Sequence, residues 1–189
     1  MESRRTVRPR RLAAPGPCGE ELARIVQAAG AAPDHDRLLP WRFVLVPEAA
    51  RPRLAAAFEP ALVERDPAAT GEQREQREQR EQAREKAFRA PVLLLAVVRL
   101  AGEAAEVPDA ERLLSLGRAV QNMQLMATAL GFASALTRGK ALGSRPLQEL
   151  FALAPDEQAV CFASMGTAAG HKPGQPRPQP DQYLTHLAP

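Results

Sequence analysis

Residues 90–98, which read APVLLLAVV, decide the fold of this chain. The stretch is aliphatic without interruption from Val92 to Val98 and follows a proline. A strand with one face in water alternates apolar and polar side chains, whereas an unbroken apolar run is typical of a strand covered on both faces. The run is far shorter than the roughly 20 residues that a membrane-spanning helix needs. The sequence therefore predicts a central strand that is buried on both faces of its sheet.

Helices are predicted on either side of this strand along the chain, over residues 19–32, 49–63, 109–130 and 145–153. In the first of them Leu22, Ile25 and Ala29 recur at steps of three and four, so they share one face. The helix over 109–130 is apolar on several sides. Such a helix must be buried in the centre of the protein or in a subunit interface.

Further strands are predicted over residues 41–46, 132–137 and 159–165. Each is a short apolar run that ends at or near a proline, a glycine or a polar turn. Strands and helices alternate along the chain without an obvious β-hairpin. This order leaves both an α/β and an α+β sandwich open.

Two segments outside this pattern have biased compositions. Residues 72–86 contain EQR repeats, and Glu, Gln and Arg all favour a helix. Because a three-residue repeat drifts around the helix and forms no apolar stripe, we expect a solvated charged helical arm, with a partner-binding arm as the alternative. Residues 170–189 are rich in proline, which predicts an extended tail without a core of its own. The length suits one domain over residues 1–189.

The composition, with its near balance of charges and its few cysteines, excludes a collagenous, a disulfide-stapled or a wholly disordered protein. The net charge is +3, and 22 of the 25 basic residues are arginine, which a coding bias explains for most of the chain. Cys18 and Cys161 are far apart and the histidines show no metal-ligand spacing, so no metal site is predicted. The basic N-terminus is not followed by the apolar stretch of a secretory signal. We therefore expect a cytoplasmic protein with two free thiols and no membrane partner.

The sequence contains none of the glycine-rich phosphate loops, nucleophile elbows or zinc-protease motifs that mark common enzyme classes. An enzyme without them would borrow its reactive group from a cofactor. Three stretches are candidates for holding one. Arg4, Arg5 and Thr6 offer two guanidiniums and a hydroxyl, which match phosphate oxygens. The pair His35 and Trp41 could line a flat aromatic ligand, and residues 131–139 leave the long helix on a polar turn.

Each of these stretches also has a simpler interpretation. The basic terminus could be no more than a solvated end of the chain. Trp41 and His35 could be a core tryptophan and a histidine at a helix end. Residues 131–139 taken alone are a weak signal.

Taken in order along the chain, the stretches resemble the nitroreductase family of FMN-dependent NAD(P)H oxidoreductases, and most of all its small single-domain members. The matching segments are RRTVR at 4–8, APDH at 32–35, PWRFVLV at 40–46, FRAPVLLLAVV at 88–98 and GRAVQNMQLMATALGF at 117–132. A predicted strand that ends at Gly166 and Thr167 follows them.

The resemblance implies an α+β sandwich with a central mixed, mainly antiparallel sheet flanked by helices. It also implies a homodimer with FMN at the subunit interface. The cofactor-binding residues that it implies are Arg4, Arg5 and Thr6 at the phosphate and ribityl end, His35 of the APDH element, and Ala135, Leu136 and Thr137 after the long helix. A basic residue near the C-terminus, Lys172 or Arg177, is a further candidate for the phosphate.

The implied reaction is the ping-pong transfer of reducing equivalents from NAD(P)H to nitroaromatic, quinone or similar small acceptors. Since the flavin carries the chemistry, no side chain is assigned a catalytic role. Leu39 stands where the family usually has glutamine, and Ala31 stands where close relatives often have arginine. This loss of polar groups leaves open a flavin-binding protein with little turnover. Arg138 is a further departure, at a position where a small hydroxyl residue is common. A nucleic-acid-binding domain built on the basic residues 4–11 is disfavoured by the small net charge and the lack of interleaved aromatic residues.

Overall fold

The computed structural model describes residues 3–65, 73–100, 106–170 and 176–187. The sheet is built around β3 (Val92–Arg99), whose residues 92–98 are all buried. β3 pairs antiparallel with β2 (Trp41–Leu45) along one edge and with β5 (Glu157–Ala168) along the other. The prediction of a central strand buried on both faces is confirmed.

β5 also pairs with two shorter strands. β4 (Ala133–Thr137) and β1 (Leu12–Ala13) both pair with β5 in antiparallel register. Pairing on both edges accounts for the length of β5, which extends two residues before and three residues after the predicted bounds. A parallel bridge joins Thr6 to Ser134, so the described sheet is mainly antiparallel, as expected.

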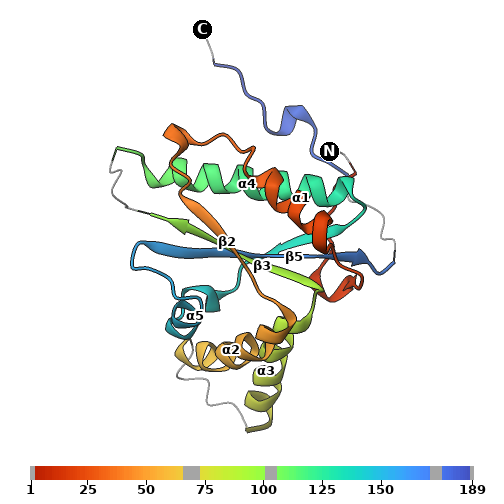
Figure 1. Cartoon of the computed structure of the whole chain (residues 1–189), viewed down its shortest axis with the longest axis vertical. Coiled ribbons are helices and arrows are strands. Elements are labelled where there is room, and N and C mark those ends of the chain that lie inside the picture. The colour runs from red at the N-terminus through yellow and green to blue at the C-terminus, as the bar shows by residue number, and fades with distance from the viewer. Residues whose placement is uncertain (1–2, 66–72, 101–105, 171–175, 188–189) are drawn as a thin grey trace.

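Helices cover both faces of the sheet (Figure 1). α1 (Gly19–Ala29) and α4 (Asp109–Ala129) lie on one face. α2 (Arg51–Arg65), α3 (Gln73–Glu85) and α5 (Arg145–Leu150) lie on the other. Short 3-10 turns connect these elements: η1 (Pro9–Arg11), η2 (His35–Arg37), η3 (Glu48–Ala50), η4 (Lys86–Phe88), η5 (Lys140–Gly143) and η6 (Pro180–Gln182).

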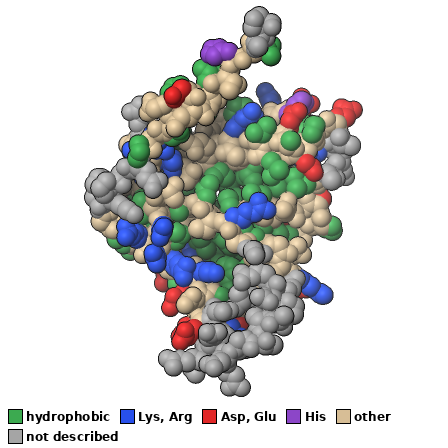
Figure 2. Space-filling view, turned by 180° about the vertical axis from the view of Figure 1, so that it is seen from behind, with side chains coloured by type: hydrophobic (Ala, Val, Ile, Leu, Met, Phe, Trp, Pro, Cys, Tyr) green, Lys and Arg blue, Asp and Glu red, His purple; other side chains and the backbone are tan. Residues whose placement is uncertain are grey.

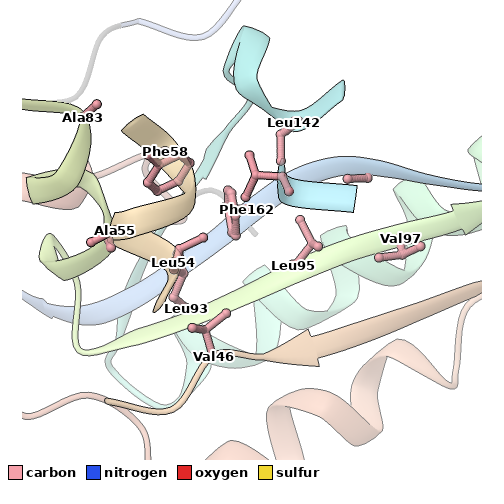
Figure 3. Close-up of a cluster of buried hydrophobic side chains, with 13 residues drawn as sticks. Val46, Leu54, Ala55, Phe58, Ala83, Leu93, Leu95, Val97, Leu142 and Phe162 are labelled. Carbon is pink, nitrogen blue, oxygen red and sulfur yellow. The ribbon is translucent and has the colours of Figure 1, made fainter. Parts of the chain in front are cut away.

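The alternation of side chains along β3 explains why both layers are needed. Leu93, Leu95 and Val97 point to the cluster under α2 and α5, where they meet Leu54 and Phe162 (Figure 3). The intervening residues of β3 point to the clusters under α1 and α4. Successive side chains of a strand face opposite sides, and each large aliphatic side chain contributes about 1.5–3 kcal/mol when fully buried. Neither face of β3 is therefore stable without its helices.

The helix α3 differs in one respect from the expected solvated arm. Ala83 in its last turn is buried in the cluster under α2, and Arg80 and Arg84 lie 3.6 Å from the carboxylate of Glu59 on α2. The expectation of a helix without a core-facing side is therefore wrong for this turn. An alanine in a charged repeat carries too little apolar area to show as a stripe in the sequence.

The described part of the tail, residues 176–187, is exposed and extended apart from η6. Arg177 donates from Nη2 to the main-chain carbonyl of Arg4, which holds the start of this segment against the N-terminus. Among the described helices, none combines the length and the apolar character that a membrane span requires.

A bidentate ion pair joins β2 to the start of β5. Arg42 on β2 donates from Nε and Nη2 to the two carboxylate oxygens of Glu157, at 2.7 and 2.8 Å. The backbone N–H of Ala154 donates to the same carboxylate at 3.1 Å. The Glu157 side chain is only 7% exposed. The hydrogen bonds from Arg42 are the main cause that lowers the pKa of Glu157 from 4.5 to about 2.

We predict that this pair makes the stability of the protein fall as the pH drops between about 5 and 2. The folded-state pKa of Glu157 is depressed, so its stabilisation is present above its unfolded pKa and is lost as the pH falls through the folded value. Denaturant unfolding should show Glu157→Gln to be less stable than wild type at pH 7, with a smaller difference at pH 3. Glu149→Gln, which removes an exposed ion pair to Arg145, is the matched control and should change little. An equal loss for Glu157→Gln at both pH values would contradict the assignment.

Candidate functional site

The N-terminal basic segment is held against the free edge of β4. The backbone N–H of Val7 donates to the carbonyl of Ser134 at 3.0 Å, and the hydroxyl of Ser134 accepts from Gln124 Nε2 of α4 at 3.2 Å. Arg4 Nη1 lies 3.5 Å from the hydroxyl of Thr6. The structure therefore brings the predicted residues Arg4, Arg5 and Thr6 to the strand that carries Ala135, Leu136 and Thr137.

The strand β4 faces this segment mainly through its backbone. Ala135 is 1% exposed, so its side chain is part of the core and does not reach a ligand. The carbonyl of Ser134 points away from β5, because it accepts from Val7. Backbone polar groups alternate between the two edges of an antiparallel strand, so those of Leu136 point to the same edge as those of Ser134. A ligand beside β4 would meet the backbone of Leu136 and the exposed residue Thr137.

A cavity of about 270 Å³ opens where β4 ends, and Pro9 and Thr137 both line it. Its apolar lining comes from Phe58, Ala61, Ala83, Leu93, Leu142 and Phe162. Its basic lining comes from Lys86, Arg89 and Arg138, and the lining residues include no Asp or Glu. The face of the molecule seen in Figure 2 exposes hydrophobic side chains near its middle, with Lys and Arg side chains around them.

The sequence did not identify most of this cavity. No sequence pattern indicates Lys86 or Arg89 as site residues, and Arg138 stands out only as a departure from a family pattern. The available signal was the position of Lys86 and Arg89 directly before the central strand. The signal is insufficient alone, because only the folded sheet brings residues near positions 58, 86 and 138 together.

The APDH and Pro-Trp elements form a separate, well-connected cluster at the beginning of α4. The carboxylate of Asp34 accepts from the hydroxyl of Ser115 at 3.0 Å and from the backbone N–H of Leu39. Trp41 Nε1 donates to the Ser115 hydroxyl at 2.9 Å. These bonds fix a segment in which Leu39 has a φ of 46°, a conformation that is unfavourable for residues other than glycine.

Within this cluster Trp41 fits the simpler of its two interpretations. Its ring packs against the buried clusters under α4 and lies 5.5 Å from the ring of Phe43. His35 is about half exposed, and its Nδ1 lies 2.8 Å from the carboxylate of Glu111 in the first turn of α4. His35 is therefore accessible to a ligand, whereas the Trp41 ring packs against the hydrophobic core.

One chain does not bring His35 to the other predicted site residues. His35 contacts Glu111 near the start of α4, whereas Ser134, beside Thr6, contacts Gln124 near the end of the helix. A helix rises 1.5 Å per residue, so these two contacts are separated by about 20 Å along α4. Arg4, Arg5 and Thr6 thus belong to one group of candidate residues and His35 to another.

Of the two C-terminal residues that are candidates for binding the phosphate, only Arg177 lies within the described residues. Arg177 contacts the carbonyl of Arg4 and so lies beside the first group. Lys172 lies outside the described residues. No group of three or more His, Cys, Asp or Glu side chains in the described part of the chain is placed to hold a metal ion.

Comparisons with known proteins give a consistent result. A model of the nitroreductase family matches residues 1–167. A putative NAD(P)H nitroreductase of Haemophilus influenzae is 32% identical over 158 residues, which cover 84% of this chain and 82% of that protein. The putative NAD(P)H nitroreductase YdjA of Escherichia coli K12 is 34% identical over 157 residues, which cover 83% of this chain and 81% of that protein.

Solved structures share the fold. A nitroreductase-like family protein from Bacillus cereus superimposes with a TM-score of 0.80 at 17% identity, over 98% of this chain and 92% of that chain. The FMN-dependent nitroreductase NfnB from Mycobacterium smegmatis, solved with NADPH, superimposes with a TM-score of 0.72 at 19% identity, over 98% of this chain and 95% of that chain.

The Ser115 hydroxyl links two elements of the site, and its removal has a predictable cost. Ser115→Ala leaves Trp41 Nε1 and one oxygen of Asp34 without this partner, and we expect a loss of about 1–2 kcal/mol in unfolding free energy. Because Trp41 is the only tryptophan, its fluorescence emission should shift to the red if the segment loosens. The control is Ser144→Ala, since the buried Ser144 hydroxyl has no hydrogen-bond partner in the described structure. Equal stability losses for the two variants would refute the linking role of Ser115.

Proposed function

Because this chain belongs to the nitroreductase family, we propose that it is an FMN-dependent oxidoreductase that transfers reducing equivalents from NAD(P)H to nitroaromatic, quinone or similar small acceptors. The observation that carries the proposal is the continuous path from the basic N-terminal segment, along the free edge of β4, to the apolar cavity. The names of the curated relatives and the FMN-dependent nitroreductases among the structural neighbours support it.

The chemistry of these residues fits FMN, which consists of a flat ring system, a ribityl chain and a phosphate. Apolar and aromatic side chains line the cavity, as a flat ring requires. Arg4, Arg5 and Thr6 provide charged and hydroxyl groups of the kind that bind phosphate. No acidic residue among the cavity-lining residues opposes the negative charge of the cofactor.

The protein's part in this reaction is to bind and orient. The chemistry that bound FMN would supply is two-electron transfer from the nicotinamide to the acceptor, in a ping-pong order. The side chains at the cavity hold the reactants near each other and exclude water. We assign no side chain the role of an obligatory acid or base.

The site is proposed to be completed by a second copy of the chain, in a homodimer. Leu113 and Leu114 of α4 are 42% and 56% exposed, and they neighbour the cluster that holds His35. An exposed apolar patch on a long central helix favours a subunit interface. In this arrangement His35 of the partner subunit approaches a flavin whose phosphate is held by Arg4 and Arg5.

Loss of Arg5 should weaken FMN retention. Arg5→Ala removes a charge-assisted contact to the phosphate, which is worth about 1.5–3 kcal/mol, or about 10–150-fold in Kd. Titration of the apoprotein with FMN, followed by flavin fluorescence, measures the change. Arg53→Ala, at an exposed arginine of α2 outside the cavity lining, is the matched control. If both variants bind FMN as wild type does, the phosphate is not held at this end of β4.

Mixed dimers test whether two chains share one site. Arg5→Ala and His35→Ala chains, each with its own affinity tag, should bind FMN weakly as homodimers. A purified mixed dimer contains one site with both residues intact and should recover tight binding at that site. Recovery would show that Arg5 and His35 of different chains act on one flavin. A mixed dimer as weak as both homodimers would contradict the shared site.

A further inference from the structure

Two guanidiniums, those of Arg89 and Arg138, line the cavity, and its lining residues include no Asp or Glu. Within the described residues neither Arg89 nor Arg138 has an ion-pair partner. Some arginines elsewhere in the fold are paired, for example Arg42 with Glu157 and Arg99 with Asp156. What distinguishes Arg89 and Arg138 is their position, because both line a cavity whose lining residues include no Asp or Glu.

The surroundings of these guanidiniums strengthen their effect. Phe58, Leu93 and Phe162 line the same cavity, and apolar walls reduce the screening of a charge by water. The field of Arg138 reaches the strand beneath the cavity. Burial raises the pKa of the Cys161 thiol on β5, and the positive charge of Arg138 acts in the opposite direction.

This charge is separate from the proposed phosphate site. The basic N-terminal segment contacts β4 at Ser134, whereas Arg138 follows the end of the strand. Four residues of strand span about 13 Å, so Arg138 and the Ser134 contact are about that far apart along the chain. A flavin phosphate held by Arg4 and Arg5 leaves the guanidinium of Arg138 available to another anion.

We propose that Arg138, assisted by Arg89, recognises an anionic group on a substrate that enters the cavity beside the flavin. The planar fork of a guanidinium donates two parallel hydrogen bonds to a carboxylate or a phosphate, which a neutral amide does not accept in the same way. The anion is either a carboxylate on an aromatic acceptor or the additional phosphate that distinguishes NADPH from NADH. This inference rests on the proposed function for the identity of the neighbouring cofactor.

The first test is equilibrium binding, which needs no turnover. Calorimetry with 4-nitrobenzoate and 4-nitrobenzamide compares an anion with a neutral molecule of nearly the same shape. Wild type should bind the carboxylate about tenfold more tightly, Arg138→Gln should lose that preference, and Arg138→Lys should retain part of it. The same comparison of NADPH with NADH identifies the phosphate as the source of the anion. Arg53→Gln on α2 is the charge-matched control and should leave both ratios unchanged.

Steady-state kinetics provide the second measurement. The ratio of kcat/KM for the two nitroaromatics should fall about tenfold in Arg138→Gln. The intrinsic reactivity of each acceptor cancels when the ratio is compared between wild type and variant. A change in the ratio for 4-nitrobenzoate over 4-nitrobenzamide supports the inference and indicates that the acceptor carries the anion. A change in the ratio for NADPH over NADH also supports it and indicates that the donor carries the anion. Unchanged ratios in both binding and kinetics would overturn it.

Flavin content separates this inference from the proposed function. Each variant is purified and its bound FMN is measured. If Arg138→Gln loses FMN as Arg5→Ala is expected to do, Arg138 is a flavin ligand; the inference is then wrong and the proposed function stands. If wild type binds no FMN but still prefers 4-nitrobenzoate through Arg138, the proposed function is wrong and the anion site stands.

Discussion

Burial of β3 on both faces is the constraint on which the rest of this structure depends. Leu93, Leu95 and Val97 require one helical layer, and the alternate residues of the strand require the other. With helices on both sides, β5 is fixed beside β3 and in turn fixes β4 along its other edge. The cavity lies at the end of β4, in the layer of α2 and α3. The position of the candidate site thus follows from the burial of one strand.

Local patterns in the sequence were sufficient to predict the elements and the class of fold. The unbroken run at 92–98 predicted β3, and the apolar periodicity predicted α1 and α4 to within a few residues at their ends. Patterns of this kind depend on nearest neighbours in a helix or a strand, which are close in sequence. The core contact of Ala83 could not be predicted, because a single small side chain produces no periodicity in the sequence.

The geometry of the site could not be predicted in the same way. Phe58, Arg89 and Arg138 meet at one cavity only because three distant segments converge on the same end of the sheet. The expectation that Arg5 and His35 serve one cofactor came from a resemblance. In the structure these residues lie near opposite ends of α4. One cofactor could therefore contact both residues only if they belonged to two different chains.

The proposed function can be tested with the visible absorption spectrum of the purified protein under anaerobic conditions. The spectrum is recorded before and after addition of NADPH or NADH. The purified protein should show a flavin band corresponding to about one FMN per chain. This band should bleach with the reduced nicotinamide and return when a nitroaromatic or a quinone is added. A protein that is colourless and stays colourless after incubation with FMN would contradict the proposed function.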